Sequence, residues 1–188
     1  MKVIAFTGAG ISKQSNIPTF MEQPEVRNKL FRSYANKHPL EYNQVIKDLK
    51  KNMNGAKPND AHFALKDYDV QIITMNIDGL HSEAGSYNVL ELHGGLPDDD
   101  EMDFAYNLYN KPVLYGDPAP NYEKAYNLVN SLTKEDYFLV IGCSYHTAIA
   151  CDLRQVANYR GAKVIEINSD AKNNVRKILK EIYYIKIS

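Results

Sequence analysis

Apolar and polar positions divide the chain into short β-rich runs that alternate with segments of helical periodicity. The runs predicted as strands are Lys2–Phe6, Val70–Thr74, Val89–Leu92, Pro112–Tyr115, Tyr137–Ile141, Lys163–Ile167 and Tyr183–Ile187. The segments predicted as helices are Pro24–Asn36, Leu40–Met53, Asp60–Lys66, Tyr122–Leu132, Thr147–Tyr159 and Ala171–Lys180. Strands that are apolar throughout and alternate with helices are typical of a parallel sheet covered on both faces. We therefore predict an α/β fold built on one such sheet.

Small, polar and ionisable residues follow nearly every predicted strand. The segments concerned are Thr7–Ser12, Met75–Gly79, His93–Gly95, Gly116–Asp117, Gly142–Ser144 and Asn168–Asp170. The carboxyl ends of parallel strands meet at one edge of the sheet, where such folds bind their ligands. We therefore expect these segments to line a single polar crevice.

The turn after the first strand, Gly8-Ala9-Gly10, permits two interpretations. Glycines let the backbone pass close to a pyrophosphate with its N–H groups pointing inward. A tight strand-to-helix turn that holds nothing explains the same residues, because a lone G-x-G is a weak signal.

Composition narrows the class of protein. The chain has 188 residues and is 44% hydrophobic, enough to fill the core of one compact domain. With 22 basic and 23 acidic residues the net charge is -1, so we expect no nucleic-acid and no membrane partner. We find no signal-peptide pattern and no run long enough to cross a bilayer. Cys143 and Cys151, which form no C-x-x-C pair, suggest a reducing, cytoplasmic setting.

Several motifs follow one another in an order that carries a family resemblance. They are GAGIS (8–12), IPTF (17–20), NIDGLH (76–81), ELHG (91–94), YGDPAP (115–120), VIGCS (140–144) and VIEIN (164–168). With them the chain resembles the sirtuin family of NAD-dependent protein deacylases, for which NIDGLH followed by ELHG is specific. The resemblance implies one domain over 1–188, a Rossmann-like sheet with a reduced helical module inserted at about 21–68. It also implies NAD as co-substrate, bound in the crevice between the two.

The resemblance assigns three residues to catalysis. His93 would be the general base that deprotonates a hydroxyl of the nicotinamide ribose while the acyl oxygen attacks C1' and nicotinamide leaves; its alternative is a structural histidine at the strand end. An unperturbed pKa of about 6.5 suits such a base. Asp78 would accept a hydrogen bond from the nicotinamide carboxamide, or simply cap the following helix. Asn76 would bond a ribose hydroxyl, or hold the loop.

The remaining NAD contacts implied by the resemblance are small or polar residues at strand ends and apolar residues that wall the nicotinamide pocket. With the catalytic loop included they are Gly8, Ala9, Gly10, Ser12, Ile17, Phe20, Asn76, Ile77, Asp78, Gly142, Ser144 and Asn168. Ser144 could instead cap a helix, and Asn168 could form a turn with Asp170. Tyr115, Gly116 and Asp117 would lie beside the strip where an acyl-lysine peptide adds as a strand, although a surface turn explains them nearly as well.

The chain also departs from the family pattern. Sirtuins carry two zinc-binding cysteine pairs after the catalytic histidine, whereas the segment 94–111 contains no cysteine, so we expect no zinc. Thr19 and Met21 replace an acid and an arginine, and Met75 replaces a glutamine, which removes charged and forked contacts to NAD.

These observations favour an NAD-dependent protein-lysine deacylase that yields nicotinamide and O-acyl-ADP-ribose. Two alternatives stay open. An NAD hydrolase, or an ADP-ribosyl transferase or hydrolase, would use the same pocket without a peptide. A binding module would sense NAD or ADP-ribose with little turnover.

Overall fold

The computed structural model describes residues 1–19, 22–145 and 147–184. Its centre is a sheet of five parallel strands in the order β3-β2-β1-β4-β5. The strands are β1 (Val3–Thr7), β2 (Gln71–Thr74), β3 (Val89–Glu91), β4 (Tyr137–Ile141) and β5 (Lys163–Ile167). Every residue of β1 and of its neighbour β4 is buried, which explains why both read as continuous apolar runs. The predicted α/β fold with a parallel sheet is confirmed.

Along the chain, the helices lie between successive strands, and α8 follows the last strand. They are α1 (Pro24–Arg27), α2 (Arg32–Lys37), α3 (Pro39–Met53), α4 (Asp60–Asp67), α5 (Leu80–Glu83), α6 (Asn121–Asn130), α7 (Ala148–Tyr159) and α8 (Ala171–Tyr184), with 3₁₀ helices η1 (Ala9–Ile11), η2 (Lys13–Ser15) and η3 (Asp99–Asn107). The single helix predicted over Pro24–Asn36 is two helices, α1 and α2. None of the helices in the described ranges is long and apolar enough to span a membrane.

Two predicted strands are wrong. Pro112–Tyr115 is no strand, and Tyr115 makes only an isolated parallel bridge with Phe31, because the chain turns back at Asp117, whose N–H donates to the Leu114 carbonyl at 2.9 Å. Of the run Tyr183–Ile187, the first two residues belong to α8, and residues 185–187 lie outside the described part. The buried residues Val175, Leu179 and Ile182 continue a helical stripe into this region.

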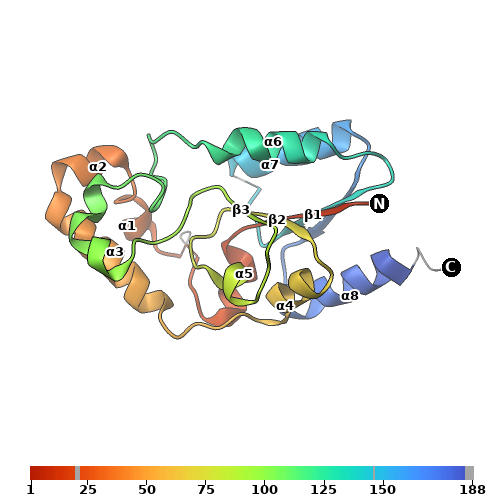
Figure 1. Cartoon of the computed structure of the whole chain (residues 1–188), viewed down its shortest axis with the longest axis horizontal. Coiled ribbons are helices and arrows are strands. Elements are labelled where there is room, and N and C mark those ends of the chain that lie inside the picture. The colour runs from red at the N-terminus through yellow and green to blue at the C-terminus, as the bar shows by residue number, and fades with distance from the viewer. Residues whose placement is uncertain (20–21, 146, 185–188) are drawn as a thin grey trace.

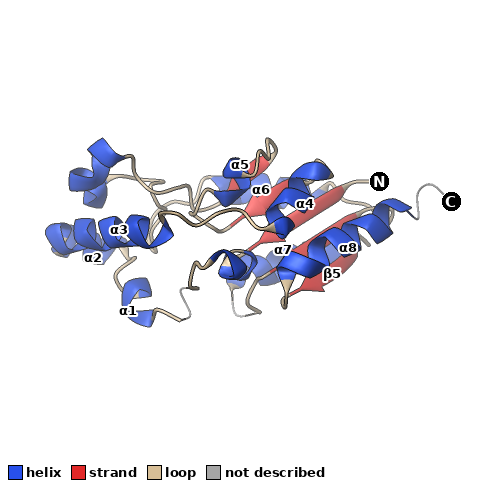
Figure 2. Cartoon of the chain, turned by 90° about the horizontal axis from the view of Figure 1, so that it is seen from below, coloured by secondary structure: helices blue, strands red, loops and turns tan. Residues whose placement is uncertain are grey.

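The helices cover both faces of the sheet, as predicted (Figure 2). On one face, α4 and α8 pack on alternate strand residues such as Ala5 and Leu139. On the other, α6 and α7 pack on the intervening residues, among them Phe6 and Phe138, whose rings lie 6.4 Å apart. This alternation follows from the two-residue period of a strand.

A third core lies beside the sheet, in the part of the molecule that holds α2 and α3 (Figure 1). Tyr42 and Ile46 of α3 pack there against Met102 of η3 and Leu114. The segment after His93 therefore contributes to this helical module. By contrast, α4 packs on the sheet core, so the residues of the expected module at about 21–68 are divided between two cores.

Arg32 joins the two segments of this module. Its guanidinium bonds both Asp117 carboxylate oxygens at 2.6 and 2.7 Å and donates to the carbonyls of Tyr106 and Leu108 at 2.6 Å each. The Tyr109 ring lies 4.3 Å from the guanidinium carbon. Burial alone would raise the pKa of Asp117, but the hydrogen bonds from Arg32 and the Leu114 N–H outweigh it, so this pKa is lowered. The pair is thus a largely buried ion pair, with 11% of the Arg32 side chain and 1% of the Asp117 side chain exposed.

Removing one member of this pair should cost far more than removing both. We expect Arg32→Ala to lower the free energy of unfolding by about 3–5 kcal/mol, because it leaves the Asp117 carboxylate buried and unpaired. The double variant Arg32→Ala/Asp117→Ala is the matched control and should lose less than the single variant. Urea denaturation at neutral pH measures both; a single variant as stable as wild type would contradict this account.

The turns that follow β1 and β4 touch each other through the backbone of glycine residues. A Cβ on Gly10 would lie 2.6 Å from Gly142 Cα, and Gly142 itself has φ +61°. Both positions therefore require glycine for packing and, at Gly142, also for backbone conformation. This contact fixes the distance between the turns that follow β1 and β4.

We expect Gly142→Ala to lower the unfolding free energy by about 3 kcal/mol or more, since a clash adds to the left-handed strain. Gly55→Ala is the matched control: φ is +84° there, but a Cβ would meet nothing within 4 Å. It should cost only about 1 kcal/mol. Equal losses in a denaturant titration would show that the close approach contributes nothing.

Candidate active site

The turns after β1 and β2 bring three predicted site residues together. Ser12 donates its hydroxyl to Asp78 Oδ2 at 2.6 Å, and Asn76 Nδ2 lies 3.2 Å from both Ser12 Oγ and Asp78 Oδ2. The other carboxylate oxygen, Oδ1, accepts the Leu80 N–H at 3.0 Å. The N-cap of α5 is Gly79, so Asp78 lies one residue before the cap; it bonds the first N–H of α5 and at the same time belongs to the polar cluster. Its bond to the nicotinamide carboxamide stays a prediction.

The glycine turn behaves differently from the phosphate cradle expected of it. The Gly8 N–H donates to the Ile141 carbonyl and the Gly10 N–H to the Gly142 carbonyl, each at 3.0 Å. These two N–H groups do not point into the crevice, because the close approach of the turn to Gly142 uses them. The turn still lies at the strand ends beside Ser12, and NAD binding by Gly8, Ala9, Gly10 and Gly142 stays a prediction.

His93 lies just beyond β3 with both ring nitrogens engaged. Nδ1 is 3.0 Å from the Met75 carbonyl oxygen, and Nε2 is 3.0 Å from the Tyr122 hydroxyl. A carbonyl only accepts hydrogen bonds, so Nδ1 carries the proton and Nε2 presents its lone pair. Burial lowers the pKa of His93, and the bond to Met75 opposes that effect only in part. A neutral imidazole of this tautomer suits a general base.

Sequence reasoning missed Tyr122. It is the second residue of α6, and only a helical pattern marks that region of the chain. The motif YGDPAP ends two residues earlier, at Pro120, which places the start of a helix near the site but does not indicate a contact with His93.

Two further histidines lie behind the cluster and are buried. His81 Nε2 is 3.0 Å from the Thr7 hydroxyl, and the Asn59 N–H donates to His62 Nδ1 at 3.2 Å. Their rings lie 4.9 Å apart. Burial lowers the pKa of His62 to about 4 and that of His81 to about 3. Both are therefore neutral structural residues at pH 7.

The ends of β4 and β5 are joined by Asn168. Its Oδ1 accepts the Cys143 N–H at 3.2 Å, and its Nδ2 donates to Glu166, which is paired with Arg154. Asn168 thus holds the 142–144 turn, which contains the half-buried Ser144. Contacts of these residues with an adenosine ribose or a phosphate stay predictions.

The residues predicted to wall the nicotinamide pocket and those predicted to lie beside a peptide differ in their exposure to solvent. Ile17 and Ile77 are buried, and Phe20 lies outside the described residues. Tyr115 is 53% exposed and stacks on Phe31 with ring centroids 4.8 Å apart. The Asp117 carboxylate is buried against Arg32, and peptide binding beside Tyr115, Gly116 and Asp117 stays a prediction.

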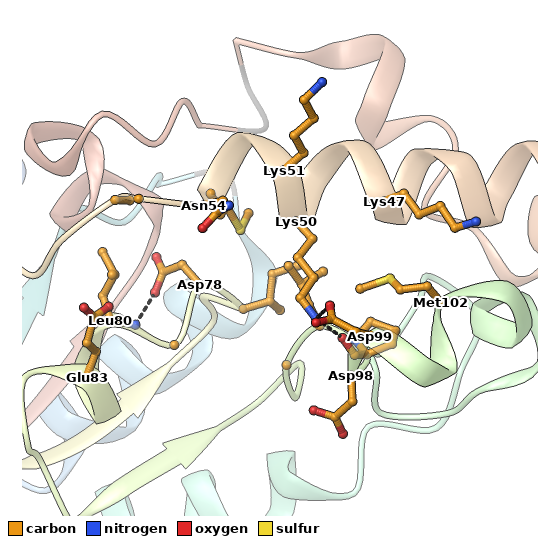
Figure 3. A pocket seen from close by; sticks show the side chains of 18 of the residues that line it. Lys47, Lys50, Lys51, Asn54, Asp78, Leu80, Glu83, Asp98, Asp99 and Met102 are labelled. Carbon is orange, nitrogen blue, oxygen red and sulfur yellow. Dashed lines mark hydrogen bonds and ion pairs between the residues drawn. The ribbon is translucent and has the colours of Figure 1, made fainter.

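A cavity of about 800 Å³ lies between the end of α3, the turn at Ile77–Leu80 and the segment that leads into η3. Asp78 points toward it, and Lys50 extends across it to Asp99, with which it forms an ion pair of 2.8 Å, whereas Lys51 points away (Figure 3). Glu91, half-buried, also lines it, and burial followed by the charge of Asp78 raises the pKa of Glu91. The site therefore has room for a ligand directly beside the polar cluster.

The segment after His93 offers no cysteine ligand for a structural zinc ion of the sirtuin kind. The segment 94–111 has no cysteine and instead forms η3, which packs Met102 and Ala105 into the third core. No cluster of three or more His, Cys, Asp or Glu side chains that could hold a metal ion is found among the described residues.

The buried histidines predict an acid-sensitive fold. Their pKa values are lowered in the folded state, so their contribution is complete above about pH 6.5 and is lost as the pH falls toward about 4. We expect the denaturation midpoint to fall across this window. His81→Gln should flatten the dependence, whereas the control His38→Gln, at the exposed end of α2, should not. An unchanged slope in His81→Gln would contradict this.

Comparison with known proteins agrees with this geometry. Residues 8–100 match the model of the Sir2 family. The chain is 32% identical to an NAD-dependent protein deacylase of Thermococcus sibiricus, covering 89% of this chain and 80% of the relative. It is 33% identical to an NAD-dependent protein deacetylase of Clostridium tetani, covering 93% and 85%.

Solved structures agree as well. One from work on the mechanism and regulation of Sir2 enzymes has a TM-score of 0.79 at 25% identity, covering 98% of this chain and 93% of the other. A Sir2 structure with an inhibitor, 2'-O-acetyl-ADP-ribose and a deacetylated peptide has a TM-score of 0.78 at 25% identity, covering 96% and 93%. With its motifs in order and its fold shared, this chain belongs to the Sir2 family.

Proposed function

We propose that the protein is an NAD-dependent protein-lysine deacylase that releases nicotinamide and O-acyl-ADP-ribose. The observation that carries the proposal is the placement of His93, a neutral imidazole whose Nε2 accepts a hydrogen bond from a hydroxyl, at the same sheet edge as the Ser12–Asn76–Asp78 cluster. The deacylase and deacetylase names of its relatives support the same activity.

Asp78 is suited to hold the nicotinamide carboxamide. An ionised carboxylate offers about four lone-pair sites. Ser12, Asn76 and the Leu80 N–H use three of them, which leaves one for the amide NH₂ of the leaving group. Because the carboxylate is already fixed by three donors, it loses little freedom when the ligand binds.

His93 would take the proton from a hydroxyl of the nicotinamide ribose while the acyl oxygen attacks C1'. Ser144 and Asn168, which lie together at the ends of β4 and β5, would hold the phosphate and the adenosine ribose. Ile17, Ile77 and Phe20 would wall the nicotinamide.

The protein would work without zinc and in a reducing cytoplasm. In place of a metal module, the Arg32–Asp117 pair and the packing of η3 on α3 support the wall next to Tyr115. This role of the Arg32–Asp117 pair is supported by the four hydrogen bonds that Arg32 makes to the segment 106–117.

One observation favours a second candidate, NAD cleavage without a peptide. The Tyr115 N–H and C=O already bond Leu30 and Arg32, and those of Leu114 are taken by the Asp117 carboxylate and N–H. A peptide strand that adds to this element would therefore have mainly the Gly116 backbone for pairing. Water in place of the acyl oxygen would make the protein an NAD hydrolase.

The test is nicotinamide release from NAD, with and without an acetyl-lysine peptide. We expect release to require the peptide and to fall by about 10²–10⁴-fold in His93→Ala, the range for loss of a general base. His38→Ala, a histidine on the surface of the helical module, is the control and should keep full activity.

Release without peptide would replace the deacylase by the hydrolase. Binding of ADP-ribose with no release under either condition would overturn both and leave a sensor of NAD or ADP-ribose.

A further inference from the structure

The Tyr122 hydroxyl lies 3.0 Å from His93 Nε2, the atom that the proposed reaction needs as a base. The two rings are 6.1 Å apart and tilted by 39°. Since the Nδ1 proton is directed to the Met75 carbonyl, Nε2 can only accept, and the tyrosine hydroxyl is the donor. Before any ligand binds, the lone pair of the base is therefore occupied by a proton donor of the protein itself.

The chain builds this contact in three steps. Pro118 and Pro120 stiffen the connection after the Asp117 turn, and α6 begins at Asn121. The Asn121 amide donates to the Glu91 carbonyl at 2.7 Å, which ties the first residue of α6 to the last residue of β3. Tyr122, the next residue, is thereby carried to the side chain that follows β3. The contact is thus set by the Asn121 side chain, which anchors the start of α6 to β3, and by the half-buried position of Tyr122 itself.

We propose that Tyr122 is a positioning residue that holds His93 in its Nδ1–H tautomer and occupies Nε2 until a hydroxyl of the nicotinamide ribose takes the same place. The inference rests on the proposed function, because it assigns the base to His93. A ribose hydroxyl that donates to Nε2 would replace one O–H donor by another. The resting base is thereby kept neutral and oriented, at the cost of a bond that the ligand must displace.

Groups from three parts of the chain contact His93. The ring of His93 contacts the ring of Tyr122 of α6. Burial raises the pKa of Tyr122, and the nearby Tyr115 raises it further. From the β2 side the ring meets the Met75 carbonyl, and the Val113 N–H donates to the His93 carbonyl. Burial lowers the pKa of His93, and the hydrogen bond to the Met75 carbonyl opposes this effect.

The test is Tyr122→Phe, which removes the hydroxyl and keeps the ring. A hydrogen bond donated to the neutral imidazole disfavours its protonation, so its loss should raise the pKa of His93 in the free protein, followed by NMR titration of the histidine ring. NAD should bind about three- to fivefold more tightly, since no internal bond has to be displaced. The acid limb of the kcat/KM profile for deacylation should move to higher pH.

Tyr126→Phe is the matched control. It lies one turn further along α6, and its hydroxyl donates to Asp152 at 2.8 Å rather than to His93. It should change neither the His93 titration nor NAD affinity. The thermal midpoint of both variants separates a change at the base from a general loss of stability.

The outcomes distinguish the two proposals. An unchanged His93 titration, or weaker NAD binding, in Tyr122→Phe overturns the positioning role. A shifted titration with tighter NAD binding supports it, whether or not the protein deacylates. If that shift occurs while neither wild type nor variant deacylates a peptide, the positioning role stands and the proposed function fails.

Discussion

The contact between Gly10 and Gly142 is the constraint on which the rest of the site depends. Backbone meets backbone there without a side chain between, and the Gly10 N–H bonds the Gly142 carbonyl. This closeness sets the separation of the turns that follow the two central strands. From it follow the position of Ser12, which holds Asp78, and that of the 142–144 turn, which Asn168 holds from β5. The glycines are required by packing in the protein itself, whatever ligand lies above them.

Much of the fold could be predicted from the sequence, because its signals are local. The apolar runs of β1 and β4 are buried on both faces, and the helical stripe of α8 faces the sheet. Ser12, Asn76 and Asp78 could be placed at one edge because strand ends of a parallel sheet converge there. The error at Pro112–Tyr115 arose because a short apolar run does not reveal that Asp117 and Arg32 fold it into a turn.

Contacts between distant residues were beyond such reasoning. Nothing in the pattern around Tyr122 indicates that α6 is tied to β3 by Asn121, and the pairing of Arg32 with Asp117 spans 85 positions. Likewise the glycine pattern indicates N–H groups that face a phosphate, whereas those of Gly8 and Gly10 donate to the carbonyls of Ile141 and Gly142. Sequence patterns report which face of an element is buried, whereas these contacts depend on how separate elements are docked.

The placement of β3 has a consequence for how the protein would fail. This strand is three residues long, half-buried and paired with one neighbour, β2, at the rim of the sheet. Short segments with a single partner open at lower free energy than a central strand does. His93 lies two residues beyond the end of that strand, so the reactive end of the molecule belongs to a smaller cooperative unit than the core around β1 and β4. Warming or mild denaturant can then abolish the activity of the protein through a local opening at β3, while its overall secondary structure is still intact.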